Sequence, residues 1–287
     1  MKATSLLAEG TRRLGAAGVE NPAGDARLIL LHAAGWTRND LAVDPERPVG
    51  KIAANTFLSL VDRRAAREPL SHLTGRRGFW TLDFEVGRDV LDPRPDSESL
   101  IEAALDLFPA QDAAIRVLDL GVGSGCLLLS VLAERPNATG IGVDLSPGAL
   151  AVARRNAEAS GLSSRAEFAI GSWGQGIDGQ FDLVLCNPPY IESGAIDALA
   201  PEVSRYEPVL ALDGGPDGLD AYRAVAPDIF RLLAPGGAAV VEAGAGQMDE
   251  IANLFACAGL CERERRTDLG GIPRAGVFVH AVGESAA

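Results

Sequence analysis

Short apolar runs alternate with helix candidates from Ser97 onward, and this alternation limits the possible folds more than any other feature of the chain. Parallel strands need a crossover, usually a helix, between one strand and the next, so the pattern predicts a mostly parallel, doubly wound α/β sheet. The strand candidates are the runs 115–120, 140–143, 167–170, 182–186, 238–242 and 276–281. Sheets of this kind bind ligands beyond the carboxyl ends of their strands.

Helix candidates lie at 126–132, between Pro147 and Gly161, and at about 219–233. Residues 1–75 differ, because their apolar positions recur at helical spacing and glycines separate them, so a small helical domain is expected there. Alternating apolar and polar residues at 81–86 indicate a strand, which makes 76–92 a β-strand or hairpin linker. The α/β domain is then expected to span 93–287.

The charge of the chain is strongly uneven. The 287 residues carry a formal net charge of −13, with +2 on residues 1–75 and −15 on residues 76–287. An acidic body repels phosphate backbones, which argues against direct binding of nucleic acid. A hydrophobic share of 47% rules out a disordered chain and is ample for a globular core.

Cysteine usage and the absence of long apolar runs predict a cytoplasmic protein. The four cysteines form no CxxC pair, and two thiols four residues apart do not complete a zinc site, so we expect reduced cysteines and no metal. The first residues lack the apolar core of a signal peptide. No run approaches the roughly 18 apolar residues of a membrane span, so no membrane partner is expected.

A glycine-rich turn follows the first strand candidate of the α/β domain. Gly121, Val122, Gly123, Ser124 and Gly125 make up this turn, which precedes a predicted helix. Glycines let the backbone approach a ligand, and a helix N-terminus offers free N–H groups. The dinucleotide pattern G-x-G-x-x-G fails here, because its third glycine would stand at position 126, which is a cysteine.

Two carboxylates flank this turn and indicate a nucleoside ligand that carries a positive charge. Asp119 precedes the first glycine, and Asp144 ends the second strand candidate, 23 residues after Gly121, where it can accept both ribose hydroxyls. S-adenosyl-L-methionine fits this description, with its adenine, ribose, ammonium and sulfonium groups. Trp173, after the third strand candidate, is placed to cover the adenine.

The turn Asn187-Pro188-Pro189-Tyr190 ends the fourth strand candidate. Two consecutive prolines fix φ and remove two backbone donors, so the carbonyls of the turn are free to act as acceptors. The side-chain oxygen of Asn187 and the carbonyl of Pro188 can then hold the two hydrogens of a planar NH2 group. Tyr190 can lie against the face of that group.

With these motifs the chain resembles the bacterial protein-glutamine methyltransferases that modify peptide chain release factors, the HemK/PrmC family. Further matching stretches are 68–75, 79–80, 93–98 and 207–219, followed by Glu242, Gly244 and Gln247. The resemblance implies a Rossmann-like class I S-adenosylmethionine-dependent methyltransferase domain behind a small N-terminal helical domain that recognises the substrate. It implies methylation of the glutamine amide nitrogen in the Gly-Gly-Gln loop of a release factor.

The resemblance also implies site residues. Cofactor contacts are expected from the 121–125 loop, Asp144, Ser172, Trp173 and Asn187, with Asp119 beside them, and substrate binding from residues 187–190. Asn187, Pro188 and Tyr190 would carry catalysis. Val122 replaces the usual threonine of the family, and Ser172 replaces a frequent carboxylate, so the contacts at these two positions differ from the family pattern.

Three alternatives remain open at this point. A sister family with the same Asn-Pro-Pro-Tyr turn methylates a glutamine of a large-subunit ribosomal protein. The turn would also suit the exocyclic amine of adenine in nucleic acid, although residues 76–287 offer no basic groove. A module that binds S-adenosylmethionine without catalysis would not need a turn that holds an NH2 group.

Overall fold

The computed structural model describes residues 1–268 and 270–281, and the chain divides into two compact units. The helical unit contains Met1–Arg76 together with Leu199–Tyr206. The sheet unit contains Arg77–Ala198 and the chain from Glu207 onward. Nothing in the sequence pattern of residues 199–206 predicts that this short segment packs with helices from the start of the chain.

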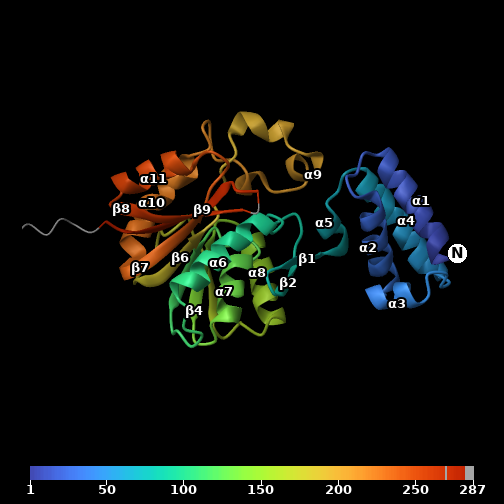
Figure 1. Cartoon of the computed structure of the whole chain (residues 1–287), viewed down its shortest axis with the longest axis horizontal. Coiled ribbons are helices and arrows are strands. Elements are labelled where there is room, and N and C mark those ends of the chain that lie inside the picture. Colours follow the sequence, from blue (N-terminus) through green and yellow to red (C-terminus); the bar gives the residue numbers. More distant parts are fainter. Residues whose placement is uncertain (269, 282–287) are drawn as a thin grey trace, which may run out of the picture. The chain divides into compact units, whose positions relative to one another are not determined.

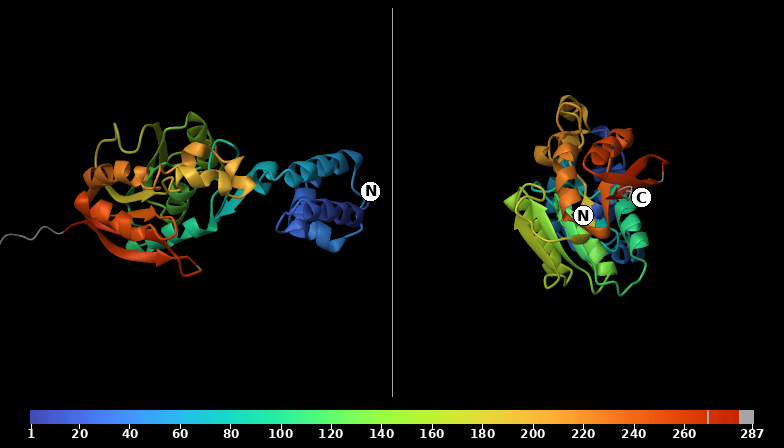
Figure 2. Two further views of the ribbon diagram at one scale, coloured as in Figure 1. Left: turned by 90° about the horizontal axis from the view of Figure 1, so that it is seen from above. Right: turned by 90° about the vertical axis from the view of Figure 1, so that its left-hand side faces the viewer.

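In the helical unit, the helices α1, α2 and α4 pack around a common apolar core (Figures 1 and 2). Its fully buried side chains include Leu6, Leu14, Ile29 and Phe57. A Cβ atom at Gly10 would lie 2.7 Å from Phe57 Cζ, so this glycine allows α1 and α4 to approach closely. The helices of the unit are α1 (Ala3–Ala16), α2 (Pro22–Ala34), α3 (Arg38–Val43), α4 (Lys51–Ala65), α5 (Leu70–Thr74) and α9 (Pro201–Ser204).

The main sheet of the sheet unit has, within the described residues, seven strands in the order β5-β4-β3-β6-β7-β9-β8. The strands are β3 (Arg116–Leu120), β4 (Thr139–Asp144), β5 (Ala166–Ile170), β6 (Phe181–Cys186), β7 (Leu233–Glu242), β8 (Leu260–Thr267) and β9 (Pro273–His280). Strands β3 to β7 all run parallel to one another, whereas β9 is antiparallel to both β7 and β8. The expected mostly parallel α/β sheet is therefore confirmed.

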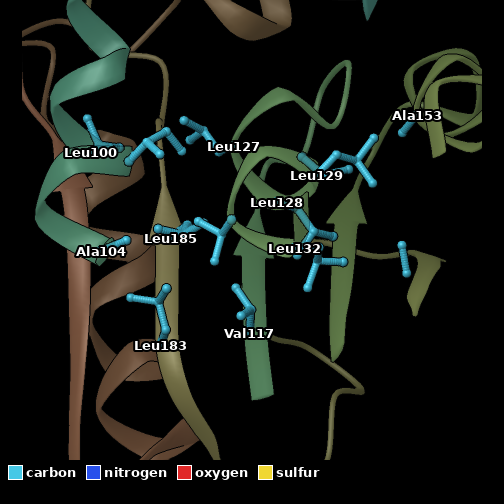
Figure 3. Close-up of a cluster of buried hydrophobic side chains, with 14 of the residues drawn as sticks. Leu100, Ala104, Val117, Leu127, Leu128, Leu129, Leu132, Ala153, Leu183 and Leu185 are labelled. Carbon is cyan, nitrogen blue, oxygen red and sulfur yellow. The ribbon is translucent and has the colours of Figure 1, made fainter. Parts of the chain in front are cut away.

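Helices cover both faces of this sheet (Figure 1). Successive strand residues point to opposite faces, so Val117 packs with one apolar cluster and Leu118 with the other. Figure 3 shows the first cluster, in which leucines of β6 and α7 meet α6. That face is covered by α6 (Glu98–Leu107), α7 (Cys126–Glu134) and α8 (Pro147–Ala159), and the other by α10 (Asp220–Leu232) and α11 (Met248–Cys257).

The sheet unit also contains short elements before and between the strands of the main sheet. Strands β1 (Arg76–Phe79) and β2 (Leu82–Glu85) pair as a separate two-stranded sheet. The 3-10 helices are η1 (Pro95–Ser97), η2 (Ser193–Ala198) and η3 (Val209–Ala211). The first of these leads directly into α6, so it places Ser97 at the N-terminal end of that helix.

The edge strand β8 was not expected from the sequence. It carries five charged residues, and four of its eight residues are exposed, which is typical of edge strands that avoid pairing with other chains. Its hairpin with β9 is the reason that β9 runs antiparallel to β7, against the parallel direction of the other strands. The strand expected at 276–281 is the second half of β9 and the residue after it.

Neither a membrane span nor a metal centre is found in the described part of the chain. No helix there is long and apolar enough to cross a membrane. The same residues hold no group of three or more His, Cys, Asp or Glu side chains that could bind a metal ion. The four cysteines, Cys126, Cys186, Cys257 and Cys261, are unpaired as disulfides.

Candidate active site

A cavity of about 400 Å³ opens where β3, β4, β5 and β6 end, within the sheet unit. Its volume lies in the range of small-ligand pockets, and its place is where doubly wound sheets bind their ligands. The predicted site residues that line it are Gly121, Val122, Gly123, Ser124, Asp144, Trp173, Asn187 and Pro189. Those that do not line it are Asp119, Gly125, Ser172, Pro188 and Tyr190.

The glycine loop between β3 and α7 has a backbone that only glycine adopts easily. Gly121, Gly123 and Gly125 have φ values of 81°, 52° and 84°, all in the left-handed region. The N–H groups of Gly121 and Val122 both donate to the carbonyl of Val143 at 2.9 Å, which ties the loop to β4. The loop therefore forms one wall of the cavity next to the N-terminus of α7.

Asp144 braces this loop as well as lining the cavity. Its Oδ2 accepts from Gly123 N at 2.9 Å, and its Oδ1 accepts from Ser146 N at 2.8 Å. A carboxylate held by two backbone donors has a fixed orientation and keeps further lone pairs for a ligand. The side chain is thus both a structural brace and a possible acceptor for hydroxyl groups.

Asp119 is buried at the end of β3, with only 1% of its surface exposed. Its Oδ2 accepts from Leu128 N at 3.2 Å, and its Oδ1 has no hydrogen-bond partner among the described residues. Burial raises its pKa to about 7, the Leu128 hydrogen bond opposes this shift, and the charge of Asp144 adds to it. A buried carboxyl group with an unpartnered oxygen favours a positive charge nearby.

Trp173 lines the cavity next to the glycine loop. A Cβ atom at Gly121 would lie 3.6 Å from Trp173 Cζ3, so the indole ring and the loop backbone are close neighbours. Trp173 has a φ of 51°, a backbone conformation that bulky side chains rarely adopt and that the surrounding structure must hold in place. Ser172, the residue before it, does not line the cavity.

In the Asn-Pro-Pro-Tyr turn after β6, the side chains separate into two groups. Asn187 and Pro189 line the cavity, whereas Pro188 is buried. Tyr190 packs against the second apolar cluster, and its hydroxyl group donates to Glu242 Oε1 at 3.3 Å. The turn therefore presents the Asn187 amide to the cavity and is anchored by Tyr190.

Ser97, Glu242 and Gln247 support this turn, although the sequence indicated them only as parts of matching stretches. Asn187 Nδ2 donates to Ser97 Oγ at 3.3 Å, and Gln247 Nε2 donates to the carbonyl of Tyr190 at 3.1 Å. Glu242 ends the apolar strand β7, just as Asp144 ends β4. An acidic residue at the end of a buried strand was thus the signal that could have singled out Glu242.

Arg94 and Glu207 form an ion pair next to the same cavity. Arg94 lines the cavity and lies 2.5 Å from Glu207 Oε1. Burial raises the pKa of Glu207 to about 7, although the charge of Arg94 opposes this shift. The guanidinium group is thus positioned at the wall of the cavity by a buried carboxyl group.

Comparison with known proteins identifies the family of the chain and supports its fold. The model of the PrmC N-terminal domain matches residues 5–75, and a methyltransferase domain model matches residues 111–266. The release factor glutamine methyltransferase of Rhodospirillum rubrum is 48% identical over 94% of this chain and 82% of that protein. The chain belongs to the release factor glutamine methyltransferase family. The resemblance drawn from the motifs is therefore confirmed.

Other relatives agree with this assignment to the release factor glutamine methyltransferases. The Caulobacter vibrioides protein of that name is 49% identical over 90% of this chain and 89% of its own length. A solved methyltransferase structure from Pyrococcus furiosus matches 71% of this chain and 92% of that chain, with a TM-score of 0.52 and 17% identity. At this identity the structural match supports the fold alone, that of a Rossmann-like class I methyltransferase.

Proposed function

We propose that this chain transfers a methyl group from S-adenosyl-L-methionine to the side-chain amide nitrogen of the glutamine in the Gly-Gly-Gln loop of a peptide chain release factor. The observation that carries the proposal is that Asn187 and Pro189 line the same cavity as Gly121, Asp144 and Trp173. A group that can hold a planar NH2 therefore shares one cavity with groups suited to a nucleoside. The names of the relatives supply the substrate class.

The residues around the cavity fit S-adenosylmethionine. Asp144 would accept the ribose hydroxyls, Trp173 would cover the adenine, and the glycine loop would approach the ligand closely. The unpartnered, buried Oδ1 of Asp119 suits the positive charges of this cofactor. When bound, S-adenosylmethionine supplies an electrophilic methyl group on a sulfonium.

The chain's own task is to hold a poor nucleophile in line. The lone pair of an amide nitrogen is delocalised into its carbonyl, so the substrate needs positioning. The oxygens of the Asn187 side chain and the Pro188 carbonyl would accept the two NH2 hydrogens, and Tyr190, which packs against the second apolar cluster, would hold the turn in place. Alignment of this kind can lower a barrier by roughly 7–11 kcal/mol.

The same two oxygens would also act on the charge that develops during transfer. The amide nitrogen becomes positive as the new bond to carbon forms, and preorganised acceptors stabilise that charge without reorganising. The methylated nitrogen is then acidic and loses its proton after transfer. No proton needs to be removed before the methyl group moves.

The helical unit would recognise the protein substrate. All residues that line the cavity belong to the sheet unit, so the helical unit contributes nothing to the reacting groups. A fragment that begins at Arg77 should still bind S-adenosylmethionine but methylate a whole release factor with a lower kcat/KM. Circular dichroism must first show that the fragment folds, and an unchanged kcat/KM would assign the helical unit another role.

The direct experiment offers labelled S-adenosylmethionine and the purified chain three substrates side by side. These are a release factor, the large-subunit ribosomal protein that carries a methylatable glutamine, and DNA. We expect label in the release factor, at the glutamine of its Gly-Gly-Gln loop by mass spectrometry, and none in a factor with that glutamine changed to alanine. Label in the ribosomal protein alone or in DNA alone would show that the release factor is not the substrate. Binding of S-adenosylmethionine without any methyl transfer would indicate a non-catalytic module.

A further inference from the structure

The carboxyl group of Glu242 lies inside the sheet unit next to the Asn-Pro-Pro-Tyr turn, and it has no role in the proposed reaction. Strands β6 and β7 are parallel neighbours, with Cys186 paired to Val241. Asn187 directly follows β6 and Glu242 is the last residue of β7, so they lie side by side at the carboxyl ends of these two strands. Glu242 is 2% exposed, and burial of an acidic group is costly unless hydrogen bonds or a nearby positive charge compensate for it.

Both oxygens of Glu242 accept hydrogen bonds from residues of the site. Ser97 Oγ donates to Oε2 at 2.5 Å, and the Tyr190 hydroxyl group donates to Oε1 at 3.3 Å. An ionised carboxylate only accepts hydrogen bonds, so the directions of these two bonds are fixed by its charge. The single hydroxyl proton of Ser97 is therefore committed to Glu242.

Because Ser97 donates its hydroxyl proton to Glu242, only one kind of hydrogen bond to Asn187 is left to it. With its proton used, Ser97 Oγ can only accept from Asn187, and the NH2 end of the Asn187 amide is the end that can donate. The structure has this bond, from Asn187 Nδ2 to Ser97 Oγ at 3.3 Å. An amide turned by a half rotation would place two oxygen lone pairs against each other.

We propose that Glu242 is a positioning residue, which acts through Ser97 and Tyr190 to turn the carbonyl oxygen of the Asn187 amide toward the substrate NH2. The inference rests on the proposed function, because it assigns this oxygen the substrate amide as partner. It adds to that function a defined proton order, in which Ser97 donates to Glu242 and Asn187 donates to Ser97. Tyr190 is held by the same carboxylate, so one charge orients both side chains of the turn.

The hydrogen bonds from Asn187 to Ser97 and from Ser97 to Glu242 have these directions only while Glu242 is ionised. Burial raises the pKa of Glu242 to about 7, while the bonds from Ser97 and Tyr190 and the charge of Arg274 oppose this shift, and Asp96 adds to it. A protonated Glu242 can donate to Ser97, which frees the serine proton and removes the fixed orientation of the Asn187 amide. The titratable and charged groups that act on Glu242, or that its charge acts on, are Tyr190, Tyr222, Cys126, Cys186, Asp96 and Arg274.

The test uses Glu242→Gln in the full chain, with the release factor and S-adenosylmethionine as substrates. We expect kcat to fall about 10–100-fold, the scale of a small misalignment, while the dissociation constant of the cofactor stays within about threefold. The kcat of the parent should fall as the pH drops below about 7, and this acidic limb should be absent from the variant. Glu250→Gln, the same change at an exposed position of α11, is the matched control and should leave kcat unchanged.

Ser97 supplies a second, independent variant if Glu242→Gln does not fold. Ser97→Ala breaks the link and should lose activity as Glu242→Gln does, whereas Ser97→Thr keeps the hydroxyl group and should restore it. A kcat of Glu242→Gln, or of a folded Ser97→Ala, within about threefold of the parent across the pH range would overturn the inference.

A nuclear magnetic resonance measurement separates this inference from the proposed function. The side-chain NH2 resonance of Asn187 is assigned by its loss in Asn187→Asp, and it should shift in Glu242→Gln if the carboxylate orients that amide through Ser97. An unmoved resonance would overturn the role of Glu242 whatever the substrate. A parent chain that fails to methylate the release factor would overturn the proposed function, while the resonance still decides the role of Glu242.

Discussion

Arg64 and Glu202 lie 138 residues apart in the sequence, and their side chains form a 2.9 Å ion pair inside the helical unit. Arg64 Nε also donates to Asp25 Oδ2 at 2.7 Å, and Arg67 Nε lies 2.6 Å from Glu202 Oε1. Burial opposes the ionisation of Glu202, but the hydrogen bonds from Arg67 and Arg64 outweigh it and lower its pKa to about 2. This ionic cluster explains why a short segment that follows the Asn-Pro-Pro-Tyr turn in sequence packs with the N-terminal helices.

Asp25→Ala should destabilise the helical unit, because it leaves the nearly buried Arg64 with one carboxylate partner fewer. Loss of one partner of a buried ion pair costs about 3–5 kcal/mol, and the remaining bond to Glu202 places the expected loss at the lower end. Hydrogen exchange of the amides in α2 and α4, followed by mass spectrometry, measures this loss.

The matched control for Asp25 is Asp62→Ala. Asp62 pairs with Arg13, but its side chain is 64% exposed, so its removal should change exchange far less. Equal loss of protection in the two variants would show that the buried cluster has no special part in holding the helical unit together.

Asp144→Ala should weaken the binding of S-adenosylmethionine more than Tyr190→Phe does. The first change removes the proposed acceptor of the ribose hydroxyls, and a hydrogen bond to a charged group contributes about 1.5–3 kcal/mol. Tyr190 does not line the cavity, so loss of its hydroxyl group should leave the affinity unchanged. Isothermal titration calorimetry compares the two, and unchanged affinity in Asp144→Ala would remove Asp144 from the binding site.

Asp119 should make the stability of the ligand-free chain depend on pH. Because burial raises its pKa to about 7, the folded chain keeps this proton at pH values where the unfolded chain has lost it. The contribution of this group to stability therefore falls as the pH rises from about 4 through about 7. Asp119→Asn should gain stability relative to the parent at about pH 8 compared with about pH 5, because its amide does not ionise.

Urea denaturation followed by circular dichroism gives the free energy of unfolding of Asp119→Asn and of the parent, each at about pH 5 and about pH 8. A difference between them that is the same at both pH values would mean that the Asp119 carboxyl group ionises as easily in the folded chain as in the unfolded one.

The sheet was predictable from the sequence because its central strands are buried on both faces and read as apolar runs. The strand β8 was not, since only its first residue, Leu260, is both apolar and fully buried, and charged residues fill its outer positions. The segment 199–206 could not be placed either. Its attachment depends on Arg64, which is distant in sequence and looks like any other charge of a helix.

The site was predictable where its ligand-binding side chains lie at the ends of strands. Asp144 and Asn187 end or follow apolar runs, and the structure brings both to one cavity. The support of Asn187 was not predictable, because Ser97 and Glu242 are 145 residues apart and meet only once the strand order places β7 beside β6. A sequence pattern shows which residues end strands, but not which hydroxyl group lies between them.

The alignment of the substrate amide by Asn187 is the central claim, and the kcat of Asn187→Ala on the release factor at saturating cofactor tests it most directly. The variant loses one of the two acceptors for the NH2 group, so kcat should fall about 10²–10³-fold, as for other preorganised groups. Asn187→Asp, which keeps an acceptor oxygen, should retain more activity than Asn187→Ala. If Asn187→Ala turns over the release factor within about threefold of the parent, the turn is structural and does not align the substrate.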